Sequence, residues 1–132
     1  MSRPIRYRAW DKKSKEYRIV EKIVFDYNGN IDFVVTVDKN TRHDPYDQTL
    51  DEIVLEQDTG LKDKNGKNIC ENDIVRLYDR YVSAITWQDD YCGFRWYNEV
   101  DGYCGLGKDN EEYYEIVGTI HENPELLGGK NE

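Results

Sequence analysis

The sequence predicts a mainly β protein. Antiparallel strands form a small barrel in the C-terminal part, after an N-terminal β-hairpin subdomain and before a short C-terminal helical turn. Short runs of β-branched and aromatic residues recur along the chain, separated by Gly, Asn or Asp. Tyrosine, with 11 copies, supplies much of the apolar volume, and its hydroxyl favours half-buried rings in a thin sheet. The 132 residues match the length of one domain.

The first part of the chain predicts β hairpins. Ile5–Trp10 alternates apolar and basic residues, as a half-buried strand does, and the polar turn Asp11–Lys15 leads to a short partner strand at Tyr17–Val20. An Asn-Gly-Asn turn separates the β-rich runs Ile23–Tyr27 and Ile31–Val37, and Asn-Gly readily takes the positive φ angles of a tight hairpin.

The middle of the chain is less regular. Asp38–Gln48 is polar and contains a proline, so we expect a mobile loop there and a seam between subdomains. Leu50–Gln57 leaves two alternatives open. Its alternating aliphatic residues favour a strand. The other alternative is one helical turn capped by Asp47, Thr49 or Asp51.

The remaining elements again predict short strands. Asp63–Gly66 is a second hairpin signal, and strands are expected to begin at Ile74 and to occupy Ser83–Trp87, Phe94–Tyr97 and Tyr113–His121. A cap at Asn123 followed by Pro124 predicts one helical turn up to Leu127. We expect a single domain over residues 1–127, divisible into subdomains 1–57 and 58–127, with 128–132 as a flexible tail.

Charge and cysteine content narrow the class of protein. The net charge is −9, yet residues 1–20 carry +5 and the rest carries −14. This acidic bulk disfavours non-specific binding to nucleic acid or anionic lipid. No apolar run is long enough for a membrane helix. The three cysteines form no CxxC pair, which favours free thiols in a reducing cytosol.

The chain lacks a catalytic or metal-binding pattern. Cys92, Cys104 and His121 have none of the close ligand spacing of structural zinc, and acidic neighbours make the Cys92 thiol a poor nucleophile. The pairs Asp89/Asp90 and Glu111/Glu112 are typical of solvated turns. We therefore predict a non-enzymatic protein with no metal and no cofactor.

One predicted hairpin is rich in aromatic residues, and a strand pair cannot bury side chains on both of its faces outside a closed core. The candidate partner-binding residues are Tyr91, Phe94, Trp96, Tyr97 and Tyr103. Arg95 is the only basic residue among them, so a protein partner fits better than a nucleic acid. The alternative role for these rings is to fill the core of a small barrel.

Three blocks, Ile5–Asp11, Gln57–Val75 and Tyr114–Leu127, resemble the YopX family of phage and prophage proteins. The resemblance spans nearly the whole chain. It implies phage origin, location in the cytoplasm of the bacterial host and a mostly β fold, and it carries no established catalytic residue. Two positions depart from the family pattern: Asp58 stands where an aromatic residue is usual, and Asn72 stands where glycine is usual.

Asn72 is a mild departure, because the chain needs a left-handed turn residue there and Asn tolerates that conformation second only to Gly. By analogy, the pattern Glu71-x-Asp73-Ile-Val entering a strand favours an SH3-like barrel for the C-terminal part.

We expect a phage-encoded accessory protein that binds a host or phage protein and makes no membrane contact. The alternative is an acidic nucleic-acid mimic acting on a host DNA-binding protein, motivated by the −14 charge of residues 21–132. Homo-oligomerisation is a further expectation, through a basic face at Arg6 and Arg8.

Overall fold

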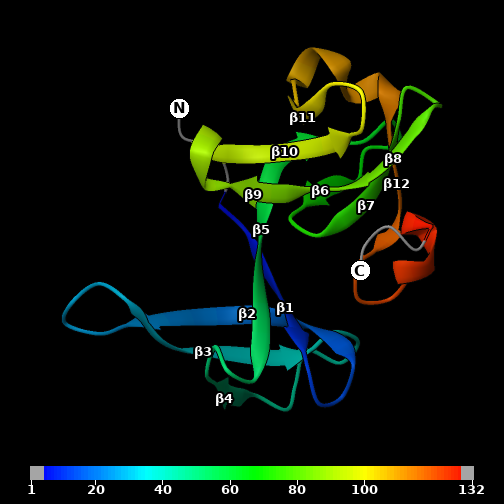
Figure 1. The fold of residues 1–132 in the computed structure, drawn as a ribbon. Helices are drawn as coiled ribbons and strands as arrows, with labels where there is room; N and C mark the ends of the chain where they lie inside the picture. Colours follow the sequence, from blue (N-terminus) through cyan, green and yellow to red (C-terminus); the bar gives the residue numbers. More distant parts are fainter. Residues whose placement is uncertain (1–4, 129–132) are drawn as a thin grey trace. The chain divides into compact units, whose positions relative to one another are not determined.

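The computed structural model describes residues 5–128, which form antiparallel β-strands and short 3-10 helices (Figure 1). The chain divides into two compact units. The N-terminal unit is Ile5–Gln57, and the C-terminal unit begins at Asp58. Every strand pairing in the described chain is antiparallel, which confirms the predicted mainly β, antiparallel fold class.

The N-terminal unit is one sheet with a small core. Its strands follow the order β4-β3-β2-β1-β5. Their bounds are β1 Tyr7–Asp11, β2 Glu16–Phe25, β3 Ile31–Asp38, β4 Tyr46–Gln48 and β5 Ile53–Lys62. Ala9, Val34 and Ile53 form the buried cluster, and neighbouring aliphatic side chains pack against it. Alternate residues of a strand face opposite sides, so these residues share one face of the sheet.

Two predicted strands merge in this unit. The predicted strand Tyr17–Val20 and the first part of Ile23–Tyr27, up to Phe25, belong to the single strand β2. The polar residues between them are absorbed by a β-bulge between Val20 and Lys22. The open alternative at Leu50–Gln57 resolves as a strand. A turn precedes it, held by the Thr49 N–H donating to the Glu52 carboxylate at 2.9 Å.

The predicted boundary between subdomains within Asp38–Gln48 is wrong, because that loop lies inside the N-terminal unit and ends in β4. The unit boundary falls within β5, between Gln57 and Asp58, which is also where the expected subdomains 1–57 and 58–127 meet. One continuous strand therefore contributes to both units: its first half pairs with β1 and its second half with β6 (Asn68–Cys70).

The C-terminal unit contains two three-stranded sheets. One has the order β12-β7-β8, and the other β11-β10-β9. Their bounds are β7 Asp73–Leu77, β8 Tyr81–Ala84, β9 Thr86–Gln88, β10 Gly93–Asn98, β11 Gly102–Gly105 and β12 Tyr114–Thr119. The 3-10 helices are η1 Asp89–Tyr91, η2 Lys108–Tyr113 and η3 Pro124–Leu127. The core comprises Ile69, Val75, Leu77, Ile85, Trp96 and Tyr114.

Several predicted features of this unit are confirmed. The helical turn after Asn123 is η3, and Asn72 has a φ of +70°, as a left-handed turn residue requires. The pairings among the described residues do not close the two sheets into a barrel, so the SH3-like barrel stays a prediction. The predicted tail at 128–132 lies beyond the described residues except for Gly128.

Aspartate side chains shape the turns of both units. In the second hairpin, the Asp63 Oδ1 accepts hydrogen bonds from the N–H groups of Asn65 and Lys67. Asp58 acts in the same way within β5. It is 7% exposed, and its carboxylate accepts the Gly60 N–H at 2.7 Å, which stabilises the irregular part of β5.

Candidate functional site

The best candidate surface is a group of tyrosines on the C-terminal unit, which we call the tyrosine surface: Tyr91, Tyr97 and Tyr103. Tyr97 of β10 lies directly opposite Tyr103 of β11, so both side chains emerge from the same face of the hairpin. Their ring centroids are 5.1 Å apart, and Tyr91 lies 6.4 Å from Tyr103. The three residues are 52%, 49% and 44% exposed, in chain order.

Two of the predicted binding residues lie elsewhere. Trp96 is 5% exposed and belongs to the hydrophobic core, because it follows Arg95 and precedes Tyr97 and therefore faces the opposite side of β10. Phe94 shares that inner side, is partly buried against the core and meets the Trp87 ring edge-on at 5.3 Å. The structure therefore brings three of the five predicted residues together on the surface and assigns the other two to packing.

Arg95 shares the outer face with the tyrosines. Its guanidinium lies 4.9 Å from the centroid of the Tyr91 ring, within the range of a cation–π interaction. Its Nη1 also donates to the Phe94 carbonyl at 2.8 Å. Gly105 stands opposite Arg95 on β11, and nothing lies within 4 Å of the position where its Cβ would be. The tyrosine surface therefore carries one positive charge, whose position these contacts fix, and Gly105 places no side chain beside it.

A hollow of about 520 Å³ adjoins the tyrosine surface. Tyr97 is one of its lining residues, together with the apolar side chains of Val82, Val100 and Leu127. The Tyr97 N–H donates to the Ser83 Oγ at 2.9 Å and so fixes β10 against β8. Sequence reasoning missed these aliphatic residues, because they come from elements far apart in the chain and no local pattern links them.

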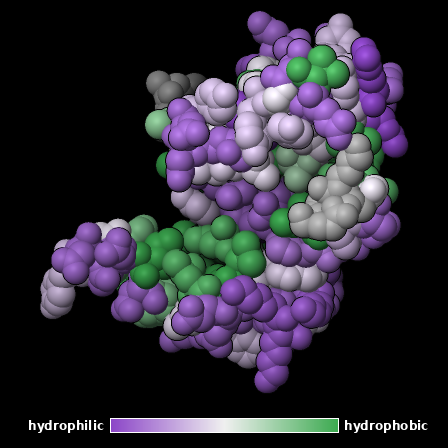
Figure 2. Space-filling model, in the orientation of Figure 1, coloured by the Kyte–Doolittle hydropathy of each residue, from purple (hydrophilic) through white to green (hydrophobic). Residues whose placement is uncertain are grey.

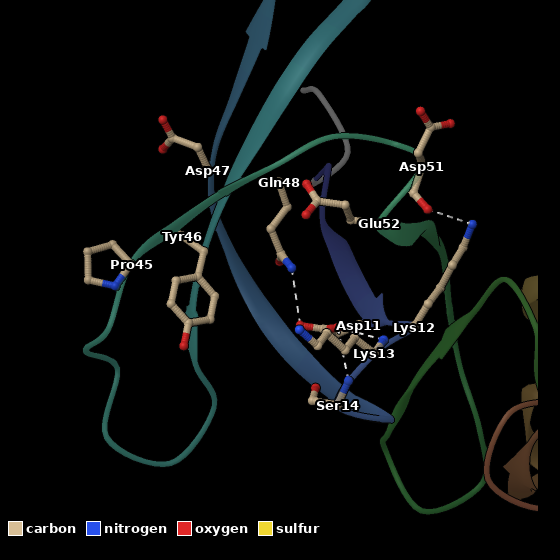
Figure 3. Close-up of a pocket in the computed structure, with 10 residues that line it drawn as sticks. All are labelled: Asp11, Lys12, Lys13, Ser14, Pro45, Tyr46, Asp47, Gln48, Asp51 and Glu52. Carbon is tan, nitrogen blue, oxygen red and sulfur yellow. Dashed lines mark hydrogen bonds between the residues drawn. The ribbon is translucent and has the colours of Figure 1, made fainter.

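A second cleft, of about 1260 Å³, lies in the N-terminal unit (Figure 3). Its central carboxylate, Asp11, accepts the N–H groups of Lys13 and Ser14 through Oδ1 and the Gln48 amide through Oδ2. Burial acts to raise the pKa of Asp11, but the hydrogen bonds from Ser14, Gln48 and Lys13 outweigh it and hold the pKa below its usual value. Oδ1 thus shapes the turn and Oδ2 ties it to β4, so both oxygens of Asp11 have structural roles.

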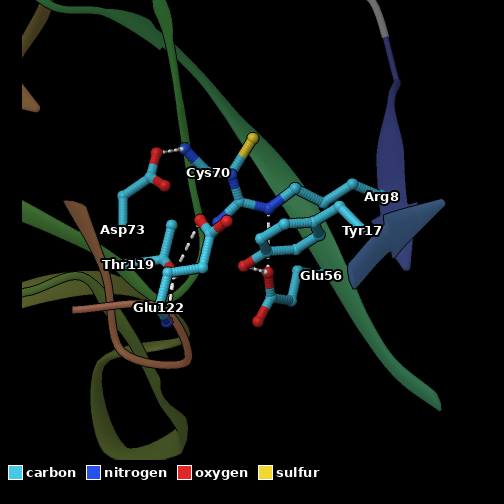
Figure 4. A network of polar contacts seen from close by, with 7 residues as sticks. All are labelled: Arg8, Tyr17, Glu56, Cys70, Asp73, Thr119 and Glu122. Atoms are coloured by element: carbon cyan, nitrogen blue, oxygen red, sulfur yellow. Dashed lines mark hydrogen bonds and ion pairs between the residues drawn. The ribbon is translucent and has the colours of Figure 1, made fainter. Parts of the chain in front are cut away.

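Buried polar contacts also hold each unit internally (Figure 4). In the N-terminal unit, Glu56 is fully buried and accepts hydrogen bonds from Arg8 Nε at 2.8 Å and from the Tyr17 hydroxyl at 3.0 Å. In the C-terminal unit, the Asp73 carboxylate accepts the Cys70 N–H at 2.7 Å. These carboxylates act as hydrogen-bond acceptors within their own unit.

The burial of acidic residues bears on the alternative that the protein acts as a nucleic-acid mimic. The buried ones are Asp11, Glu56, Asp58, Asp63 and Asp73. A mimic has to display its carboxylates on the surface as DNA displays phosphates. These five side chains face inwards and bond mainly to backbone N–H groups, so they contribute nothing to such a display.

The thiols and candidate metal ligands are dispersed. Cys70 is half-buried, Cys92 and Cys104 carry free thiols, and Cys92 is exposed in a left-handed conformation after η1. The Cys104 Sγ contacts the Asn98 side-chain amide at 3.5 Å. Within residues 5–128, no group of three or more His, Cys, Asp or Glu side chains is arranged to hold a metal ion. No helix in the same range is long and apolar enough to span a membrane.

Comparison with known proteins places the chain in a family. The model of the YopX protein family matches residues 6–128. The crystal structure of protein EF1440 from Enterococcus faecalis is 30% identical and has a TM-score of 0.65, over 96% of this chain and 99% of that chain.

The crystal structure of YopX from Bacillus subtilis has 21% identity and a TM-score of 0.62, over 97% and 98% of the two chains, and supports the fold. No match was found among curated proteins. The chain therefore belongs to the YopX protein family.

Proposed function

We propose that this chain is a non-enzymatic protein-binding module and that the tyrosine surface contacts its partner. The observation that carries the proposal is three half-exposed rings held against one another on a paired strand framework. Tyrosine side chains supply a large contact area and a hydroxyl at low cost in conformational entropy, and they are enriched among the residues that dominate protein–protein binding.

The surroundings indicate the chemistry of the partner. The adjoining hollow offers a place for an apolar side chain, and Val100 at its margin is 79% exposed. Arg80 and Glu99 also line it and supply one charge of each sign. Within residues 5–128, Arg95 is the one basic residue that stacks on the tyrosine surface, whereas proteins that bind single-stranded nucleic acid combine their aromatic rings with a positively charged groove. A folded protein surface with a protruding apolar side chain fits this description.

Membership of the YopX family supports the wider setting of the proposal. We place the protein as a phage- or prophage-encoded accessory factor that acts in the cytoplasm of the bacterial host, on a host or phage protein. The proposal needs no catalytic residue and no cofactor, because binding alone is the activity.

Site-specific photocrosslinking tests the proposal. A photoreactive phenylalanine analogue replaces Tyr97 or Tyr103, and Tyr27 serves as the control because it is a fully exposed tyrosine of the N-terminal unit. In host lysate, we expect one adduct that forms at the first two positions and is missing at Tyr27. With the purified adduct partner, Tyr97→Ala should raise Kd about 10-fold or more, as removal of a hot-spot ring does.

Two results would contradict the proposal. One is a set of adducts that is the same at Tyr97, Tyr103 and Tyr27. The other is an affinity for the purified partner that Tyr97→Ala and Tyr103→Ala leave unchanged while the fold, checked by circular dichroism, is retained.

A further inference from the structure

Part of strand β2 lies at an open edge of its sheet. β1 pairs with residues Glu16–Ile19 of β2, whereas β3 pairs with Arg18–Phe25 on the other side. Within residues 5–128, the segment Val20–Phe25 therefore has a strand neighbour on one side only. Such an edge presents N–H and C=O groups ready to pair with another strand, and proteins usually cover or blunt it.

Apolar side chains gather beside this edge. Figure 2 shows a continuous area of hydrophobic residues on the N-terminal unit. A hollow beside the edge measures about 760 Å³, and its lining includes Ile5, Val20, Ile23, Phe25 and Ile31. Ile5 is 67% exposed and Phe25 59%. Exposed apolar side chains that gather next to an open strand edge are typical of an interaction surface.

The charged residues at this edge are complementary to those at the same edge of a second copy. Glu21 and Lys22 are adjacent, exposed and part of the lining of the hollow. When two identical strands meet antiparallel about a two-fold axis, residues just before the axis face residues just after it. An axis between Glu21 and Lys22 brings each carboxylate close to the ammonium group of the other copy.

The apolar residues agree with the same axis. Val20 pairs with Thr36 and Ile23 with Val34 on β3, so the bulge places Val20 and Ile23 on one face of the sheet. Across the axis, Val20 of one copy then meets Ile23 of the other. We propose that the β2 edge at Val20–Ile23 binds the same edge of a second copy of this chain, so that the two sheets continue into one another.

Charge reversal with rescue tests the proposal. Sedimentation velocity on the full chain over a concentration series should show a dimer. Lys22→Glu and Glu21→Lys each place like charges across the axis twice, so each should raise the dimer dissociation constant on the order of 10-fold. The double variant Glu21→Lys/Lys22→Glu restores opposite charges and should return dimerisation to near the wild-type level. The control Lys39→Glu, in the exposed turn after β3, makes the same change in net charge as Lys22→Glu and should have no effect on dimerisation.

The outcomes separate clearly. A wild-type chain that stays monomeric at the highest concentration overturns the proposal. So does a dimer that both single variants leave intact, or one that the double variant fails to restore. Backbone amide spectra confirm that each variant is folded. Tyr97→Ala, which tests the tyrosine surface of the other unit, should leave the dimer unchanged, so the two proposals succeed or fail independently.

Discussion

The two Asn-Gly-type hairpin turns offer a matched experiment on one long-range hydrogen bond. In the turn that begins at Asp26, Oδ1 accepts the N–H groups of Asn28 at 2.8 Å and Asn30 at 3.1 Å. In the turn that begins at Asp63, Oδ1 accepts the N–H groups two and four residues on at 2.9 and 3.0 Å. The geometry is the same, but Asp63 is 4% exposed and its Oδ2 also accepts the Ile116 N–H at 3.0 Å.

The difference between the turns sets the expected magnitudes. Asp26→Ala removes two hydrogen bonds whose donors water can reach, at a net cost of roughly 0.5–1.5 kcal/mol each, and thus about 1–3 kcal/mol. Asp63→Ala removes the same two bonds and leaves the Ile116 N–H of β12 unsatisfied, which adds about 1–3 kcal/mol. We therefore expect Asp63→Ala to lower the free energy of unfolding of the C-terminal unit by about 2–6 kcal/mol.

Native-state hydrogen exchange measured by NMR gives the comparison for each unit separately, because it reports the free energy of opening at individual amides. In Asp63→Ala, the Ile116 amide should lose more protection than the other amides of β12. In Asp26→Ala, the loss should be confined to the hairpin between β2 and β3.

Equal costs for the two substitutions would refute the reasoning. So would an Ile116 amide in Asp63→Ala that exchanges no faster than its neighbours in β12. Either result would mean that the Oδ2 bond across the unit does not contribute measurably, and that Asp63 acts only as a turn residue.

Three other predictions follow from the same contacts. The pKa of Asp11 lies below its usual value because hydrogen bonds outweigh the effect of burial, so its stabilisation is present above the unfolded pKa of about 3.8 and is lost as pH falls through the folded pKa. Asp11→Asn should flatten the loss of stability of the N-terminal unit below about pH 4 in acid titrations followed by circular dichroism. Gly118→Ala would place a Cβ 2.5 Å from the Asn123 Oδ1, so we expect a loss of about 1–3 kcal/mol in urea unfolding, whereas Gly105→Ala, with nothing within 4 Å, should be neutral. Glu56→Gln removes the buried charge that accepts from Arg8 and Tyr17, and should cost about 1–3 kcal/mol by the same assay, with a result below 0.5 kcal/mol counting against the role of that pair.

Local patterns predicted much of the fold. The hairpin turn between β2 and β3, the left-handed Asn72 and the helical turn at Pro124–Leu127 are set by short-range geometry, since a turn depends on which φ angles a few residues allow. The merging of two expected strands into β2 was not predictable. The interruption at Glu21 and Lys22 looks like a turn in sequence, and only pairing with β3 makes it a bulge.

The candidate site was predicted in part. Its hairpin and its aromatic content were evident, but the sequence could not decide which rings face outwards, because strand alternation gives two faces and does not say which is buried. The core that Trp96 joins consists of residues such as Ile69 and Tyr114, distant in sequence, and their packing determines the choice.

The sequence by itself thus determined the antiparallel β class, the turns and the family, since each depends on residue types within a few positions of one another. Tertiary structure decided the features that join distant residues: the exposed face of β10, the bond from Asp63 to Ile116 and the open edge of β2. The physical reason is that backbone preferences act locally, whereas burial and strand pairing depend on segments that the chain brings together only on folding.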